Sequence, residues 1–309
     1  MSTPADTRRR QPKRSPGARR EMGAELIESI GPLRHRLADA RRSNATIGLV
    51  PTMGALHAGH ARLIEQARSE CQTVAVSIFV NPLQFDRQDD LRRYPRPLDA
   101  DRRICDQLGV DVVFAPSVEE MYPIPPECTI DVGRLADHLC GKYRPGHFRG
   151  VATVVMKLFG IVQPDRAYFG EKDAQQLAII RRLVVDLNVP IQVVGVPTVR
   201  EPDGLALSSR NGQLGPAERQ SAIALFRALQ KADREIAAGD TDPEHVKRVA
   251  AAEIPPDDPS LRLEYLEIVG SDDMQPVMRI TGPVRVAGAL WVGSTRLIDN
   301  VLSSPNLVI

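Results

Sequence analysis

Short apolar runs rich in β-branched residues alternate with helical segments as far as about residue 199, and this alternation limits the fold more than any other feature. The apolar runs are TIGLVPT (46–52), TVAVSIFV (73–80), VDVVFAP (110–116), RAYFG (166–170) and IQVVGVPTV (191–199). Segments such as HARLIEQARSE and DAQQLAIIRRLVVDLN carry helical periodicity between them. Parallel strands need such helical crossovers, so the sequence predicts an α/β fold with a Rossmann-like, doubly wound parallel sheet.

The two ends of the chain differ from this pattern. ELIESIGPLRHRLADARR (25–42) is predicted to be a helix, interrupted near Gly31–Pro32, and DADRRICDQLG a helix ending at Gly109. Beyond Val199, two helical segments precede runs typical of short strands, which predicts a smaller α+β C-terminal domain. We therefore expect a disordered basic tail over 1–20, a Rossmann-like domain over 21–198 and the smaller domain over 199–309.

Composition narrows the class of protein. The chain has 309 residues, of which 42% are hydrophobic and 26% charged, as in ordinary globular proteins. Forty basic residues balance 39 acidic ones, which predicts neither a nucleic-acid nor a membrane partner, although the basic tail leaves a weak RNA contact open. Four cysteines without a C-x-x-C pair, and no apolar N-terminal region, favour reduced thiols in a cytoplasmic protein. No apolar run approaches the roughly 20 residues of a membrane helix.

The segment VPTMGALHAGHARLIEQA (50–67) runs from a predicted strand into a predicted helix. The start of a helix offers N–H groups and partial positive charge to an anion, and ligands of parallel sheets bind beyond the carboxyl ends of the strands. Gly54 and Gly59 suit sharp turns or close approach to a ligand. His57 and His60 lie three positions apart, where both imidazoles can donate to phosphate oxygens. The pattern favours a site for phosphoryl or nucleotidyl transfer.

Two other interpretations of the histidines stay open on the residues alone. They could form an incidental cluster, or they could bind zinc, although no third ligand stands at convincing local spacing. The chain contains no G-x-x-x-x-G-K-[ST] motif and no convincing G-x-G-x-x-G motif.

HAGH fits the H-x-G-H signature of the nucleotidyltransferase superfamily, and the wider pattern is more specific. PTMGALHAGH, SIFVNPLQF, YPR, HFRGVATVVMKLF, FGEKDAQQL, VPTVREPDGLALSSRN and STRLIDN follow in order. From about residue 21 to the end, this set resembles the pantoate–β-alanine ligases. The resemblance implies that ATP adenylates the pantoate carboxylate with release of pyrophosphate, and that the β-alanine amine then displaces AMP.

The resemblance implies that the domain over 21–198 binds the nucleotide and pantoate, and that the domain over 199–309 is a C-terminal lid domain. It also implies roles for individual residues. Those expected to carry catalysis are His57, His60, Lys172, Ser208, Ser209 and Arg210. Those expected to bind ATP are Pro51, Thr52, Met53, Gly54, His57, His60, Gly170, Glu171, Lys172, Asp173, Val199, Leu207, Ser208, Ser209 and Arg210. Among these, Asp173 and Gly170 are expected at the ribose, and the loop around Ser208 is expected to bring charge to the triphosphate as the second domain closes.

Gln84 and Gln176 are expected to bind pantoate, because an amide both donates and accepts. Mg²⁺ is expected to accompany ATP, with Asp101 as the candidate protein ligand, although a helix-surface acid is nearly as good an interpretation. Arg144 and His147 are expected near the β-alanine or adenylate end.

Two departures from the family's pattern stand beside these expectations. Ala100 precedes Asp101 where some members have consecutive acids, which weakens a direct metal role, and Ala174 stands where an aromatic residue is common. Members are commonly homodimers, to whose interface TVAVSIFV could contribute. An adenylyltransferase that stops at the nucleotide product is the competing function.

Overall fold

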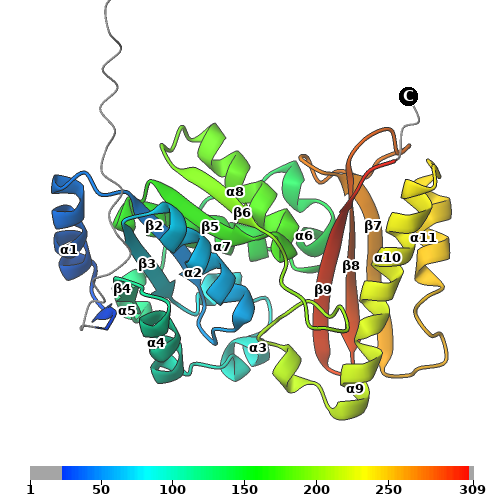
Figure 1. Cartoon of the computed structure of the whole chain (residues 1–309), viewed down its shortest axis with the longest axis horizontal. Helices are drawn as coiled ribbons and strands as arrows, with labels where there is room; N and C mark the ends of the chain where they lie inside the picture. Colours follow the sequence, from blue (N-terminus) through cyan, green and yellow to red (C-terminus); the bar gives the residue numbers. More distant parts are fainter. Residues whose placement is uncertain (1–22, 306–309) are drawn as a thin grey trace, which may run out of the picture.

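The computed structural model describes residues 23–305, so the predicted tail lies outside the described residues. Its first unit is built on a six-stranded sheet in which every pairing is parallel (Figure 1). The strands, in spatial order, are β1 (Glu25–Ile27), β4 (Val112–Phe114), β3 (Thr73–Ile78), β2 (Ile47–Thr52), β5 (Arg166–Gly170) and β6 (Gln192–Val196). This order confirms the predicted Rossmann-like, doubly wound sheet.

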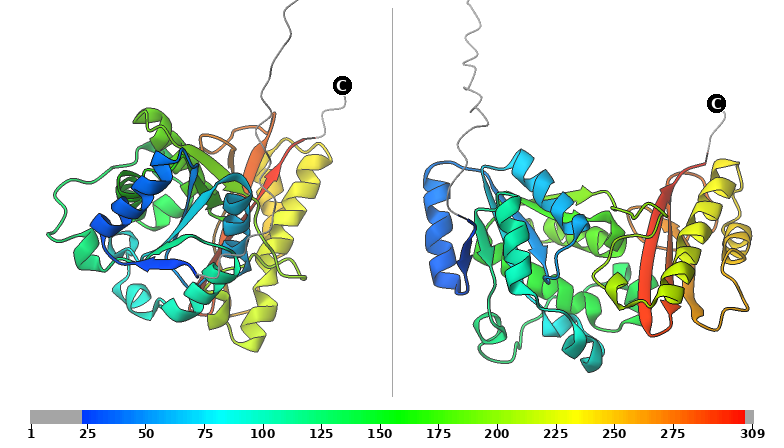
Figure 2. Two further views of the ribbon diagram at one scale, coloured as in Figure 1. Left: turned by 60° about the vertical axis from the view of Figure 1, so that its left-hand side comes forward. Right: turned by 60° about the horizontal axis from the view of Figure 1, so that its bottom comes forward.

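Helices cover both faces of the sheet because successive side chains of a strand point to opposite sides. In β2, Ile47 and Leu49 join the core beneath one set of helices, whereas Val50 joins the core beneath the other. The first face carries α1 (Ile30–Arg42), α7 (His147–Val162) and α8 (Ala174–Asp186). The second carries α2 (Ala58–Glu70) and α4 (Leu98–Gln107), and Figure 2 shows the layers from two further sides.

The order of the strands reverses direction between β2 and β5. From β2 the chain continues to β3 and β4 on one side, and from β5 it continues to β6 on the other. Loops at such a reversal diverge to opposite faces and leave a crevice outside the carboxyl ends of the strands. The segments that follow β2 and β5 therefore face the same crevice.

The prediction of a helix from residue 25 was wrong at its start. Glu25–Ile27 form β1 at the edge of the sheet, where the Glu25 N–H donates to the Asp111 carbonyl at 3.1 Å. The helix α1 begins at Ile30, and Pro32 lies in its first turn instead of interrupting it. Proline is accepted there because the first N–H groups of a helix have no partner within the helix.

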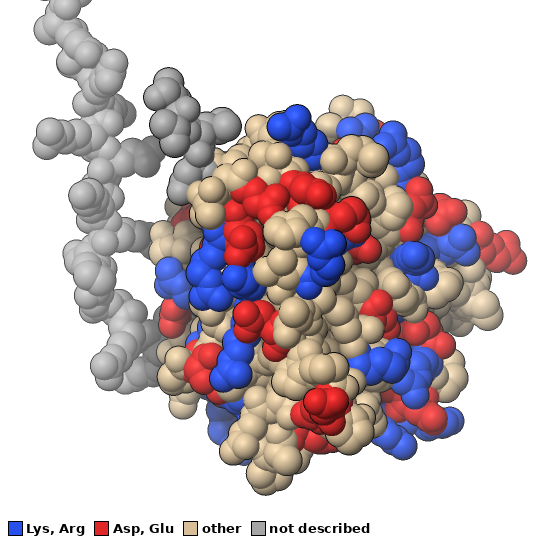
Figure 3. Space-filling model, turned by 90° about the vertical axis from the view of Figure 1, so that its right-hand side faces the viewer, with Lys and Arg blue, Asp and Glu red and all other residues tan. Residues whose placement is uncertain are grey.

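The second unit is an antiparallel sheet covered by helices on one side (Figure 1). Its elements are α9 (Pro216–Ser221), α10 (Ile223–Ala237), α11 (Pro243–Ala251), β7 (Leu261–Gly270), β8 (Val284–Val292) and β9 (Thr295–Ser303). An α+β unit was expected, but its strands of 9 or 10 residues are longer than the short ones predicted. Acidic and basic side chains intersperse over its outer face (Figure 3).

The two units share part of one apolar core. Tyr265 and Val269 of β7, together with Ala287 of β8, pack in the same cluster as Phe148 and Val151 of α7. The remaining short elements lie between or beside the units. They are η1 (Pro82–Gln84), α3 (Gln88–Arg93), α5 (Val118–Met121), η2 (Arg134–Ala136), α6 (Leu139–Tyr143), η3 (Glu171–Asp173) and η4 (Asn211–Gln213). The division near Val199 stays a prediction.

The structure bears on two expectations about the surface of the protein, one about a dimer interface and one about membrane helices. The apolar run TVAVSIFV, considered for a dimer interface, forms β3 between β2 and β4, where Val74, Ala75 and Val76 are fully buried. Its apolar character is therefore explained by the core of the sheet. Within residues 23–305, no helix has the length and hydropathy to span a membrane.

Candidate active site

A crevice of about 240 Å³ lies beyond the carboxyl ends of β2 and β5. It gathers most of the residues that the sequence singled out, although they come from five separate segments of the chain. Those that line it are Pro51, Thr52, Met53, His57, His60, Gln84, Gly170, Lys172, Asp173, Gln176, Val199, Leu207, Ser208, Ser209 and Arg210. Of the predicted site residues, Gly54, Glu171 and Asp101 do not line it.

The loop between β2 and α2 takes a conformation that depends on Gly54 and Asp101. Gly54 and Ala55 have φ of +80° and +51°, and a Cβ on Gly54 would lie 2.9 Å from an Asp101 carboxylate oxygen. That carboxylate accepts hydrogen bonds from the N–H groups of Ala55 (2.9 Å) and Leu56 (2.7 Å). Asp101 is only 1% exposed, so it is not a helix-surface acid. It holds the loop from beneath, and burial raises the pKa of its carboxyl group while the two N–H groups oppose that shift.

The two histidines of HAGH also shape the start of α2. The Gly59 N–H donates to His57 Nδ1 at 3.1 Å, and the His57 N–H donates to His60 Nδ1 at 3.3 Å. Together they form a reciprocal cap in which ring nitrogens replace the usual hydroxyl and carboxylate. A Cβ on Gly59 would lie 2.8 Å from His57 Cε1, so a glycine between the histidines leaves room for the ring.

These caps decide what the histidines can offer to a ligand. Because both Nδ1 atoms accept hydrogen bonds from the backbone, the proton of each neutral ring is on Nε2. Burial lowers the pKa of His57, with Lys172 adding to the shift, and burial together with His57 lowers the pKa of His60 to about 3. The rings, whose centroids lie 4.1 Å apart, are therefore neutral donors at pH 7.

His147 is a third neutral histidine beside the crevice, and it braces the loop that carries Gln84. Its Nδ1–H donates to the Gln84 carbonyl at 2.8 Å, and its Nε2 accepts from Arg144 at 3.2 Å. Arg144 also donates to the Gln84 carbonyl and pairs with Asp86. Burial, followed by the charge of Arg144, lowers the pKa of His147 to about 4. Arg144 and His147 thus lie together in the wall of the crevice, and their place near the β-alanine or adenylate end stays a prediction.

These depressed pKa values predict acid sensitivity. Since His60 and His147 titrate near 3 and 4 in the folded protein but near 6.5 when unfolded, the unfolded chain binds more protons below pH 6.5. Stability is therefore complete above about pH 6.5 and falls as the pH drops towards 4, by up to about 1.4 kcal/mol per pH unit for each group. Urea unfolding from pH 7 to pH 4 measures this loss.

His147→Gln should reduce the dependence of the unfolding free energy on pH. His35→Gln, at an exposed position, is the control and should leave it unchanged. The same pH dependence in the unaltered protein and in both variants would contradict the role given to His147.

The turn after β5 supplies a lysine to the crevice. Lys172 and Asp173 belong to η3, the three-residue turn that joins β5 to α8. Among residues 23–305, no side chain pairs with the Lys172 ammonium. Glu171 belongs to the same turn, but its side chain does not line the crevice. An unpaired ammonium beside two N–H donors attracts an anion.

The loop that carries Ser208, Ser209 and Arg210 closes one side of the crevice from the second half of the chain. Arg210 pairs with Asp90 of α3 at 3.0 Å, and the Ser209 hydroxyl lies 3.5 Å from the hydroxyl of Tyr94. Tyr94 is buried, and burial raises the pKa of its phenol. These contacts hold the loop against the α3 region.

The amide side chains of Gln84 and Gln176 line the same crevice as the histidines. Gln84 accepts from Asn81 at 3.0 Å and donates to the Met53 sulfur at 3.3 Å, so its amide is fixed at the wall of the crevice. Asn81, which sequence reasoning quoted but did not assign, also donates to the Gly150 carbonyl and accepts from the Tyr122 hydroxyl. Its position before Pro82, as the cap of η1, was the available signal. The Gln176 amide has no protein partner among the described residues and remains free for a ligand.

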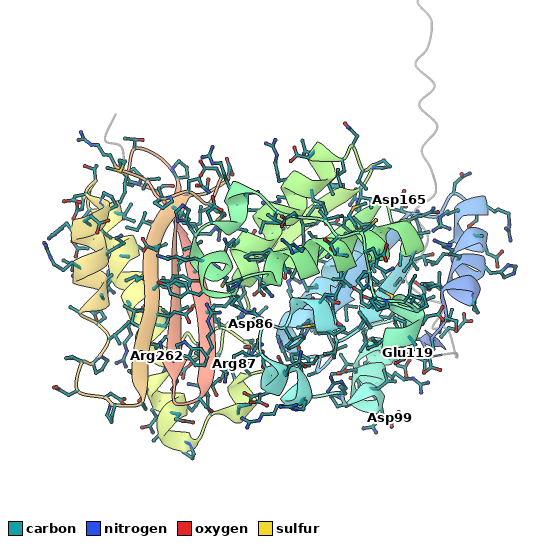
Figure 4. The ribbon with its side chains drawn as sticks, turned by 180° about the vertical axis from the view of Figure 1, so that it is seen from behind. Asp86, Arg87, Asp99, Glu119, Asp165 and Arg262 are labelled. Atoms are coloured by element: carbon teal, nitrogen blue, oxygen red, sulfur yellow. The ribbon has the colours of Figure 1, made fainter. Side chains whose placement is uncertain are left out.

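A second cavity of about 200 Å³ adjoins the crevice between the two units. Lys172, Asp173 and Arg210 line both spaces. Trp291, the single tryptophan of the chain, lies in its wall between the guanidinium groups of Arg87 and Arg262, 5.8 and 5.2 Å from the ring centroid. Figure 4 shows Arg87 and Arg262 on opposite sides of the boundary between the units. The indole is thus placed to report changes in this space.

Comparison with known proteins decides the family. The model of the pantoate–β-alanine ligases matches residues 25–302, from β1 to β9. The chain belongs to the pantoate–β-alanine ligase family. A pantothenate synthetase of Moorella thermoacetica is 51% identical over 282 residues, covering 91% of this chain and 99% of the relative.

Solved structures of this family share the fold. The pantothenate synthetase of Thermus thermophilus superimposes with a TM-score of 0.84 at 46% identity, covering 90% of this chain and 98% of its own. The pantoate–β-alanine ligase of Francisella tularensis, complexed with β-γ ATP and β-alanine, gives a TM-score of 0.75 at 35% identity, covering 90% and 97%. The predicted family, fold class and ligase activity are confirmed.

Proposed function

We propose that this pantoate–β-alanine ligase works in two steps within the crevice. A pantoate carboxylate oxygen attacks the α-phosphorus of ATP, which forms the P–O bond of pantoyl adenylate and expels pyrophosphate. The β-alanine nitrogen then attacks the acyl carbon, which forms the amide bond and expels AMP. The ammonium of β-alanine loses two protons in all, which leave to solvent or to the departing phosphate.

The observation that carries this proposal is the pair of neutral histidines whose Nδ1 atoms are occupied by the cap of α2. The backbone fixes both rings in the tautomer that presents Nε2–H, before any ligand arrives. Donors fixed in advance stabilise charge that develops on phosphate oxygens without a cost of reorganisation. Neutral donors also avoid binding the ground-state triphosphate as tightly as two cations would, which favours turnover.

The negative charge of the triphosphate also needs cations and hydrogen-bond donors, which we place at the boundary between the units. We assign Lys172 to the phosphates as a compact cation, and Ser208, Ser209 and Arg210 to the phosphate chain from the other side. Arg210 already binds a carboxylate, that of Asp90, so a phosphate oxygen can replace this partner with similar geometry. Asp173 and the Gly170 backbone are assigned to the ribose hydroxyls. The complex of the Francisella tularensis ligase supports ATP as the nucleotide.

Mg²⁺ belongs to the proposal as part of the ATP substrate. Among the described residues, no group of three His, Cys, Asp or Glu side chains gathers to hold a metal ion. An ion that arrives with ATP takes its ligands chiefly from phosphate oxygens and water. Asp101 was the candidate protein ligand, but its two oxygens already accept the Ala55 and Leu56 N–H groups. We propose for it the task of holding the phosphate-binding loop, with any influence on the ion transmitted through that loop.

Pantoate is assigned to the side of the crevice formed by Gln84, Gln176 and Met53. The fixed amide of Gln84 and the free amide of Gln176 supply donors and acceptors for hydroxyl and carboxylate groups. The apolar walls, formed among others by Val151 and Val154 of α7, suit the dimethyl carbon of pantoate and exclude water from the adenylate. Arg144 lies at the same end, where a cation can attract the carboxylate of β-alanine.

A coupled assay tests the proposed function. The protein is incubated with pantoate, β-alanine, ATP and Mg²⁺, and AMP, ADP and pantothenate are measured. We expect AMP release that depends on both organic substrates, and pantoate-dependent exchange of labelled pyrophosphate into ATP without β-alanine. ADP as the product would refute adenylation. Exchange without formation of pantothenate would favour the competing adenylyltransferase.

Gln176→Ala should raise the KM for pantoate by about 10-fold and change the KM for ATP little. The lost interaction is one hydrogen bond to a polar group, worth about 1.5 kcal/mol in a desolvated site. Steady-state kinetics with each substrate varied in turn measures both constants. Equal changes in the two KM values would place Gln176 elsewhere than at pantoate.

Two further expectations accompany the proposal. We expect the reaction to take place in the cytoplasm. We also expect a homodimer, because the family commonly forms one, and analytical ultracentrifugation of the full chain decides between one and two copies.

A further inference from the structure

The motif STRLIDN (294–300) has no role in the account above, although it forms part of the resemblance to the family. It occupies most of β9, the strand of the second unit that packs beside η3 of the first unit. Its last residue, Asn300, is 5% exposed. A buried amide this far along the chain from the turn needs a reason, because an amide is costly to bury without partners.

Asn300 binds the turn that carries Lys172 and Asp173 through the NH₂ end of its side-chain amide. Its Nδ2 donates to the Glu171 carbonyl at 2.9 Å and to the Lys172 carbonyl at 2.8 Å. Two carbonyl oxygens can be faced only by the NH₂ end of an amide, which fixes the orientation of the group. The two hydrogens of one side chain therefore hold two successive peptide units of η3.

Neighbouring side chains fix Asn300 in turn. Arg285 Nη1 donates to Asn300 Oδ1, and the Asn300 N–H donates to the Asp299 carboxylate at 2.8 Å. Arg200 donates to the same carboxylate at 2.9 Å and to the Asn300 carbonyl at 3.3 Å. Asn300 is thus held by charged groups of the second unit. Arg285 binds its side-chain amide, whereas Asp299 and Arg200 bind its backbone.

The turn joins fixed elements at both ends, because Gly170 pairs with Val196 in the sheet and α8 begins with the buried Ala174. Within the turn, the N-cap makes no side-chain hydrogen bond and none of the three side chains is buried. The hydrogen bonds from Asn300 therefore supply a support that packing of the turn's own side chains does not. A long flexible lysine works as a phosphate ligand only when its backbone is fixed.

We propose that Asn300 is a positioning residue, which fixes from the second unit the backbone of η3 and thereby the Lys172 ammonium and Asp173 carboxylate. This inference rests on the proposed roles of Lys172 and Asp173 in nucleotide binding. Asn300 lines neither the crevice nor the second cavity, so we assign it an action through the turn. The same two hydrogen bonds connect the nucleotide side of the crevice to the lid domain.

Asn300→Asp tests the proposal, because it keeps the size of the side chain and the oxygen that faces Arg285. Only the two donors to η3 are replaced, by an oxygen that repels the Glu171 and Lys172 carbonyls. We expect kcat/KM for ATP to fall by about 10- to 100-fold, the scale for misplacing a binding group through its support. The KM for pantoate should change less than twofold, because Gln84 and Gln176 share no hydrogen bond with Asn300. A merely structural role would change the constants of both substrates together.

Gln275→Glu is the matched control. Gln275 also donates from the second unit to a backbone carbonyl of the first, that of Arg134, at 2.9 Å, and neither residue lines the crevice. We expect its kinetic constants to stay within about twofold of those of the unaltered protein. Equal losses in both variants, or none in Asn300→Asp, would overturn the inference.

If Asn300→Asp does not unfold cooperatively, and is therefore misfolded, Arg285→Met tests the positioning role in its place. It leaves both donors in place but frees the orientation of the amide, so kcat/KM for ATP should fall several-fold; unchanged kinetics would overturn the inference. The outcome is distinguishable from failure of the proposed function. An inactive unaltered protein in the coupled assay refutes that function, whereas normal activity in both variants refutes only the positioning role.

Discussion

His60→Ala should lower the rate of pantoyl adenylate formation by about 10²-fold or more, the scale for losing one donor aimed at developing charge. The structure adds a second consequence, because His60 Nδ1 also accepts the His57 N–H at the start of α2. Part of the loss in the alanine variant therefore comes from a destabilised helix start and a displaced His57 ring. Pantoate-dependent pyrophosphate exchange measures the adenylation step, and thermal unfolding measures the cap.

His60→Gln separates the two effects. A glutamine at this position of a capping box can accept the His57 N–H, so α2 keeps its cap while the Nε2–H donor is lost. We expect unfolding near that of the unaltered protein together with a rate loss close to that of His60→Ala. His35→Ala, at an exposed position of α1, is the histidine control and should keep full activity. Near-normal exchange in His60→Gln would show that His60 serves only the helix.

Lys172→Met should lower kcat/KM for ATP by about 10²- to 10³-fold, because the crevice loses an unpaired cation at the junction with the second cavity. Methionine keeps the unbranched apolar stem, so packing changes little. The affinity for ATP, followed by calorimetry or by the fluorescence of Trp291, should fall less than kcat/KM if the ammonium acts chiefly on charge that develops during transfer.

Lys231→Met supplies the comparison. Lys231 lies on α10 and pairs with Glu235, so its replacement removes a surface ion pair outside both cavities. We expect unchanged kinetics and a stability within about 0.5 kcal/mol of that of the unaltered protein. The role of Lys172 would be refuted by a methionine variant that keeps the ATP constants of the unaltered protein.

The sequence predicted the long helices and strands correctly where the pattern of apolar residues within each segment shows which side chains are buried. Strands β2 and β3 are continuous apolar runs, as strands covered on both faces must be. By contrast, β1 has three residues and is stabilised by pairing with β4, more than 80 positions away. Leu26 and Ile27 fit a helix start equally well, so only the tertiary pairing decides.

Site residues divide in the same way. His57, Lys172 and Gln176 were predicted from motifs, and the fold brings all three to one crevice. Asp101 and Asn300 act through backbone groups 45 and 128 positions distant, and no local pattern encodes such a partner. A carboxylate that holds a loop and one that binds a metal look identical in sequence. Their difference lies in which N–H groups the fold brings to them.

The side chains of β7 and β8 that enter the main core have a consequence for dissection of the protein. Tyr265, Val269 and Ala287 pack in the same apolar cluster as residues of α7. A fragment ending near residue 198 would lack them and would expose the apolar side chains of α7 to water. Such a fragment should aggregate, and a graft of the sheet onto another scaffold should fail for the same reason. Because the two units share this core, substitutions in surface loops are tolerated more readily than replacement of either unit as a whole.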